Sequence, residues 1–119
     1  MEKLNSKIKK YQKVLASYIE TLAAERNQSL GSSKGYLPIT DFIHHQFQLV
    51  QATWIGSKYH YKVLLHLSIH HETGNIWVMQ NNTELDLEQD FQVMNITKSS
   101  IVLGFRSEEM RALSNYAVS

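Results

Sequence analysis

Apolar side chains recur every three or four positions through the first part of the chain. The series consists of Leu4, Ile8, Tyr11, Leu15, Tyr18 and Leu22. This is the period of an α-helix with one apolar face, and neither glycine nor proline interrupts it. The pattern therefore predicts one long helix over residues 3–26. We expect the helix to end at the Asn-Gln-Ser sequence of residues 27–29, which leads into the glycine- and serine-rich segment 31–35.

A strand pattern begins after the only proline, Pro38, and continues to about residue 80. Its clearest part is residues 61–70, where apolar odd-numbered positions alternate with a mixed even-numbered set. We expect the odd-numbered side chains to face the core and the even-numbered ones to face outward or toward a partner. Turn-forming sequences at Gly56 and Gly74 flank this segment, which predicts an antiparallel meander.

Two short helices and one more strand are expected in the last third of the chain. Thr83 is a suitable N-cap, with Asp86 three residues later as a variant of the capping box, and Glu84 would then lie in the first helical turn. Residues 101–105 predict a final strand. Ser107 can cap a second helix that ends near residue 113.

These elements predict an α+β fold in a single domain of residues 1–119. A long N-terminal helix packs on an antiparallel meander sheet of about four or five strands, with two short C-terminal helices. One helix covers one face of such a sheet and leaves the other partly exposed. We therefore expect a homo-oligomer, most simply a two-fold dimer, with Leu64, Trp54 and Val50 on the exposed face.

The composition excludes several classes of protein. The chain has 119 residues, of which 43% are hydrophobic and 19% charged, as in an ordinary globular domain. A net charge of +1 gives no overall field that would attract nucleic acid or a membrane. The absence of cysteine excludes disulfides and thiolate chemistry. No apolar run approaches a membrane span, and no signal core follows the basic N-terminus, so we expect a cytoplasmic protein.

The six histidines do not predict a metal site. His66 and His70 would share one face of a strand but lie about 13 Å apart. The pairs at 44–45 and 70–71 would point to opposite faces of a strand. The sequence also contains no zinc motif, no phosphate-binding loop and no nucleophile motif. We therefore expect no metal, no cofactor and no catalytic residue.

Two groups of side chains are candidates for binding. Lysines gather near the N-terminus, and Lys7, Lys10 and Lys13 could contact phosphates. A solvated helix face is the simpler interpretation of these lysines, because the net charge is small and no recognition helix follows. The second group is a candidate functional patch of polar residues, in which Arg111 could form an ion pair with Glu84. It consists of His66, Asn81, Thr83, Glu84 and Arg111.

Six segments in the same order resemble the XisI-like family, named for a factor that controls excision of the fdxN DNA element in cyanobacteria. The first is the helix around Tyr11, and the last is RALSNYAV at 111–118, similar to RxxTxFAV. Between them, LLHLSI at 64–69 is similar to the family's LIHIDI, and GNIWV at 74–78 is similar to GKIWI. NNTE at 81–84 is similar to DGTE, and IVLGF at 101–105 has the same letters as the family's segment. The resemblance thus spans nearly the whole chain.

The resemblance implies a non-enzymatic controlling factor for site-specific excision of a DNA element, as in the fdxN-type rearrangement of heterocyst differentiation. Such a factor would act through a partner protein of the XisH type beside a site-specific recombinase, with indirect rather than direct contact to DNA. Two alternatives stay open. One is a direct DNA-binding accessory factor that uses the lysine-rich helix. The other is a diverged nuclease-associated subunit with a polar site at His66, Thr83, Glu84 and Arg111.

The chain departs from the family pattern at positions where acids are expected. Ser68 and Asn81 stand where the family has aspartate, and Asn115 stands where it often has an acid. A metal-dependent or acid–base mechanism that required those carboxylates would be lost. The departures therefore favour a binding role over an enzymatic one.

Overall fold

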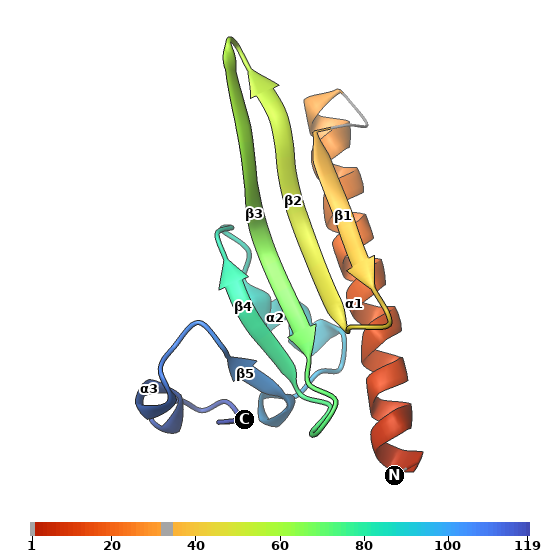
Figure 1. The fold of residues 1–119 in the computed structure, drawn as a ribbon, viewed down its shortest axis with the longest axis vertical. Coiled ribbons are helices and arrows are strands. Elements are labelled where there is room, and N and C mark those ends of the chain that lie inside the picture. The colour runs from red at the N-terminus through yellow and green to blue at the C-terminus, as the bar shows by residue number, and fades with distance from the viewer. Residues whose placement is uncertain (1, 32–34) are drawn as a thin grey trace.

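Figure 1 shows the computed structural model, which describes residues 2–31 and 35–119. The sheet is formed by β1 (Tyr36–Asp41), β2 (Gln46–Ile55), β3 (Lys58–Ile69), β4 (Ile76–Asn81) and β5 (Ile101–Leu103). The helices are α1 (Glu2–Leu30), α2 (Leu87–Val93), α3 (Glu108–Ala112) and the 3-10 turn η1 (Lys98–Ser100). The expected α+β class is confirmed. Residues 32–34, within the expected connector, lie outside the described part of the chain.

The apolar stripe of α1 packs against the sheet as the sequence predicts. Tyr11, Leu15 and Leu22 are buried in the main core. The helix ends at Leu30, four residues later than expected. Asn27 does not end the helix, because its side chain finds partners outside it instead of competing with the helical backbone.

The strands follow the order of the sequence, β1-β2-β3-β4-β5. The first four pair antiparallel, as expected, but β5 runs parallel to β4. The prediction of a purely antiparallel meander is therefore wrong for the last strand. A parallel pair requires a crossover, and α2 and η1 form it. The rings of Tyr18 in α1 and Phe91 in α2 lie 6.3 Å apart, so both helices cover the same face of the sheet (Figure 1).

A β-bulge in β3 changes which side chains reach the core. The register shifts between Leu49 and Val50, and Leu64 is the extra residue on β3. A bulge turns two successive side chains toward one side, so Leu64 is buried in the same core as Leu65. The expectation that Leu64 lies on the exposed face is therefore wrong. Beyond the bulge, Tyr61 points away from the core and is 63% exposed, contrary to the simple alternation.

The helix α2 begins later than the sequence predicts. Its N-cap is Asp86, whose Oδ1 accepts a hydrogen bond from the N–H of Gln89 at 3.2 Å. Thr83 instead accepts from the N–H of Leu85 in the preceding turn, and Glu84 therefore lies before the helix. Ser107 caps α3 as expected. None of the described helices is long and apolar enough to cross a membrane.

Candidate functional site

The polar residues of the candidate patch come from β3, the end of β4 and α3, and each takes part in local structure. Asn81 Oδ1 accepts hydrogen bonds from both the N–H and the hydroxyl of Thr83. This is an Asx turn that ends β4 and directs the chain toward α2. The neutral amide at position 81 is thus sufficient for the turn. Glu84 follows this turn and is exposed.

Arg111 acts as a clamp between α3, the C-terminal segment and the sheet. Its guanidinium lies over the ring of Trp77, 5.1 Å from the centroid. Nη1 donates to the carbonyl of Arg106 at 2.7 Å, and Nε donates to the carbonyl of Val118 at 3.1 Å. The two ion pairs within residues 2–31 and 35–119 do not include Arg111 and Glu84, so the suggested pair is not formed there.

His66 belongs to a chain of hydrogen bonds between β2 and β3. Its Nε2 lies 2.7 Å from Oε1 of Gln46, and Nε2 of Gln46 donates to Oγ of Ser68 at 2.9 Å. Burial lowers the pKa of His66 below its ordinary value, which favours the neutral ring. Ser68 is buried, and its hydroxyl has a neutral partner within the sheet, the amide of Gln46.

His70, His44 and His45 each have a separate partner, which for His45 is Nε2 of Gln12, 2.7 Å from its Nδ1. His70 stacks on Trp77 with ring centroids 4.0 Å apart, and burial lowers the pKa of His70. His44 Nδ1 lies 2.8 Å from Asp41. Across the part of the chain that the structure describes, no group of three histidines or carboxylates is placed to hold a metal ion.

The three candidate lysines do not form one free basic surface. Lys7 Nζ donates to the carbonyl of Thr73 at 3.2 Å and to Oδ1 of Asn75 at 2.9 Å. Lys7 therefore holds the N-terminal part of α1 against the β3–β4 hairpin. Lys10 and Lys13 are exposed on the helix.

The segments GNIWV at 74–78 and IVLGF at 101–105 are in contact in the fold. Gly104 follows β5, and a Cβ on it would lie 2.9 Å from the ring of Trp77 in β4 and 3.2 Å from the carbonyl oxygen of Val78. Only glycine allows this close approach without displacing a neighbour. Sequence reasoning did not identify Trp77 and Gly104 as a pair, because their contact depends on the parallel pairing of β4 with β5.

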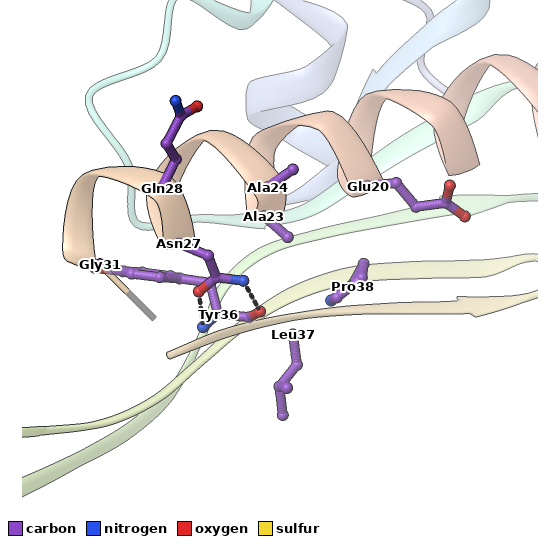
Figure 2. A pocket seen from close by; sticks show the side chains of 9 residues that line it. All are labelled: Glu20, Ala23, Ala24, Asn27, Gln28, Gly31, Tyr36, Leu37 and Pro38. Carbon is purple, nitrogen blue, oxygen red and sulfur yellow. Dashed lines mark hydrogen bonds between the residues drawn. The ribbon is translucent and has the colours of Figure 1, made fainter. Parts of the chain in front are cut away.

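A surface groove of about 610 Å³ runs between α1 and β1. Figure 2 shows Asn27 reaching from the helix to the backbone of Tyr36, with Ala23 and Ala24 along the helix and Pro38 on the strand. Glu20 is the one charged side chain that lines it. The groove carries no arrangement of a nucleophile with a base. Its clearest feature is the pair of hydrogen bonds between Asn27 and Tyr36, at 2.8 and 2.9 Å.

These features define a small α+β protein in which α1 and α2 cover one face of a five-stranded mixed sheet, and whose polar side chains mostly bind their own backbone and neighbours. The chain belongs to the XisI family: the model of the family described as XisI protein matches residues 2–118. The resemblance inferred from the sequence is thereby confirmed. A comparison with curated proteins finds no significant match.

Two solved structures share the fold. The crystal structure of a XisI-like protein from Anabaena variabilis ATCC 29413 superposes with a TM-score of 0.81, at 24% identity, and the alignment covers 94% of this chain and 99% of that one. The crystal structure of fdxN element excision controlling factor XisI from the same organism gives a TM-score of 0.71 at 25% identity, covering 95% and 99%.

Proposed function

We propose that this chain is a non-enzymatic controlling factor for site-specific excision of a DNA element of the fdxN type. The observation that carries the proposal is the family match over residues 2–118, together with 25% identity to a protein described as fdxN element excision controlling factor XisI. In this role the chain acts in the cytoplasm during heterocyst differentiation, and it regulates a recombinase complex instead of cutting DNA itself.

The use of the polar side chains supports a binding role. Ser68 and Asn81, which stand where the family has aspartates, are both hydrogen-bonded within the sheet or its adjoining turn. Arg111 is engaged with backbone carbonyls and with Trp77. Acid–base or metal chemistry would require carboxylates that these positions do not supply.

In the proposed role, the chain contacts a protein partner of the XisH type. Direct DNA binding through α1 would depend on Lys7, Lys10 and Lys13 acting together, yet Lys7 is bound to the β3–β4 hairpin. Lys3, Lys9, Lys10 and Lys13 are exposed on α1, but a net charge of +1 gives the whole chain weak electrostatic attraction to a duplex. These features fit better with indirect contact, in which this chain binds a partner protein and the partner contacts the DNA.

Co-expression with a protein of the XisH type tests the proposal. We expect the two proteins to co-elute in size-exclusion chromatography, with a mass by light scattering equal to that of a hetero-complex. Separate elution of both folded proteins would contradict the proposal.

A DNA titration at two salt concentrations distinguishes direct DNA binding from contact through a partner protein. We expect the chain alone to bind duplex weakly, and the Lys10→Ala/Lys13→Ala variant to behave like the wild type. The matched control is Lys58→Ala/Lys62→Ala, which removes the same charge from the β2–β3 hairpin. Strong, salt-dependent binding that only the first variant weakens would replace the partner-mediated mechanism with direct DNA binding.

A further inference from the structure

The face of the sheet opposite α1 and α2 is uncovered over β1, β2 and β3 (Figure 1). Large apolar side chains gather there, and we call this surface the aromatic face; it consists of Leu37, Ile39, Trp54, Tyr59 and Tyr61. Trp54 is 65% exposed, and its ring centroid lies 5.2 Å from that of Tyr59, which lies 6.3 Å from that of Tyr61. Contiguous exposed apolar surface of this kind marks an interaction site.

The aromatic face is almost free of charge. Lys58 and Lys62 lie on the opposite side of the sheet. They pair with Ile55 and Gln51, whose side chains alternate with that of Trp54 and point away from the aromatic face. Asp41, at one end of β1, is the one carboxylate that the strands β1–β3 contribute to this face. A two-fold axis brings a surface against its own copy, so an uncharged apolar surface is complementary to itself, whereas a charged one repels itself.

The two outer strands of the sheet carry local protection against strand addition, whereas residues 58–62 of β3 lie beyond the end of β4 and have no strand partner on that side. At β1, the outward N–H and carbonyl of Tyr36 are bound by the side chain of Asn27, and Pro38, the next outward position, has no N–H. At the other edge, Val102 pairs with Ala117, whose N–H donates to the carbonyl of Ile101 at 2.8 Å. Protected edges prevent uncontrolled sheet extension.

The size of the aromatic face suits a modest dimer interface. The strand β2 has 10 residues, which at about 3.3 Å per residue gives a length of about 33 Å. Three strands spaced by about 4.8 Å give a width of about 14 Å and a projected area of about 460 Å². This projection is smaller than the ~800 Å² that each partner of a standard interface buries. We therefore expect reversible association in the micromolar range.

We propose that the aromatic face docks a second copy of this chain, sheet face to sheet face, in a two-fold dimer. The two sheets then stack about 10 Å apart, as in a β-sandwich, and the exposed rings become the centre of the interface. This inference rests on the surface of the chain alone and not on the excision role, so either can fail without the other.

Sedimentation or light scattering of the isolated chain over the micromolar concentration range tests the dimer. We expect Tyr61→Glu to weaken the dimer by about tenfold or more, because it buries an unpaired charge at the interface. Trp54→Ser is the second variant, which removes a ring without adding a charge. The matched control is Val93→Glu, which places the same charge on an exposed apolar position of α2, and we expect it to dimerise like the wild type.

Circular dichroism verifies that each variant is folded before its mass is compared. A wild-type chain that stays monomeric at high micromolar concentration would overturn the proposal. A dimer that Tyr61→Glu and Trp54→Ser leave at wild-type affinity would place the interface elsewhere and overturn it too. A third result would also overturn it: a monomer whose aromatic face becomes protected from hydrogen exchange only when the XisH-type protein is added. The aromatic face would then bind that partner and not a second copy of the chain.

Discussion

The amide group of one residue, Asn27, binds both outward backbone groups of Tyr36 at the edge strand β1. It accepts from the N–H of Tyr36 and donates to the carbonyl of the same residue, as a neighbouring strand would. The side chain thus satisfies two backbone groups that an edge strand otherwise leaves to water or to another chain. One asparagine on a helix therefore links α1 to β1 and hinders strand addition at the first residue of that strand.

Asn27→Ala should lower the free energy of unfolding by about 1–2 kcal/mol, because two hydrogen bonds are lost. The measurement is urea unfolding, with Gln28→Ala as the control at the exposed neighbouring position. We also expect the Asn27 variant to aggregate faster on warming, since its edge is open. Equal stability of the two variants would contradict the role of Asn27.

Gly104 is required by the close contact between its backbone and Trp77. An added methyl group would lie 2.9 Å from the ring, so Gly104→Ala should cost about 1–3 kcal/mol of stability through overpacking. Thermal unfolding followed by Trp fluorescence measures this loss, and Asn115→Ala, at an exposed position of the C-terminal segment, is the control. An unchanged melting temperature for Gly104→Ala would show that the ring moves aside freely.

His66 should make stability depend on pH. Burial lowers the pKa of His66 below its ordinary value of 6.5, so below that pH the unfolded chain binds more protons than the folded one. The free energy of unfolding therefore falls as the pH drops through this range, until the pKa of the folded state is passed. The pKa of His70 is lowered in the same direction, so both residues contribute.

Urea unfolding between about pH 8 and 5 measures this dependence. We expect His66→Gln to reduce the slope without abolishing it, while His71→Gln, at the exposed neighbour of His70, retains the wild-type slope. Stability of the wild type that does not fall below pH 6.5 would contradict the assignment.

At the scale of elements, α1 is held to the rest of the molecule by polar contacts at separate points along its length. Lys7 binds the β3–β4 hairpin, and the hydroxyl of Tyr18 donates to the carboxylate of Asp90 in α2. Burial and this hydrogen bond raise the pKa of Tyr18 above its usual range, so the phenol remains a donor. These contacts fix where α1 lies over the sheet, which the apolar stripe alone does not determine.

Tyr18→Phe should lower the free energy of unfolding by about 1 kcal/mol, because it removes the hydrogen bond and keeps the packing of the ring on Phe91. A double-mutant cycle with Asp90→Ala measures the coupling directly. We expect a coupling free energy of the same size. Independent effects of the two substitutions would mean that α1 and α2 are joined by apolar packing alone.

The sequence predicts the elements whose pattern is long and misses those that depend on one residue. The stripe of α1 extends over many turns, so its core residues are evident before the structure is known. The bulge at Leu64 is hidden, because an apolar residue is compatible with either face of a strand. The start of α2 is similarly ambiguous, since Thr83 and Asp86 are both good N-caps and the bond from Gln89 decides between them.

At the scale of the whole molecule, sequence motifs identify the family but not the surfaces that it uses. The segments GNIWV and IVLGF are adjacent strands in the fold, where Trp77, Gly104 and Arg111 pack together. The motifs thus reflect packing and give no catalytic geometry. An open sheet face was expected from the sequence, but of its three expected residues only Trp54 is exposed there. Val50 lies on that face with 2% of its surface accessible, and Leu64 lies in the core.

The proposed dimer and the proposed contact with a partner protein can exist together, because they use different surfaces. A reversible dimer through the aromatic face leaves α1, α2 and the C-terminal segment available to a partner protein. The charge of +1 per chain makes such an assembly depend on protein contacts more than on attraction to DNA.

Excision of an fdxN-type element on a reporter plasmid measures whether this chain controls excision. The plasmid is supplied with the recombinase and the XisH-type protein in a heterologous host, with and without this chain, and the rejoined junction is quantified by PCR. We expect the amount of junction to change when the chain is present, and to return to the baseline when the XisH-type protein is omitted. An identical amount of junction with and without the chain, at verified expression of all proteins, would contradict its role as an excision controlling factor.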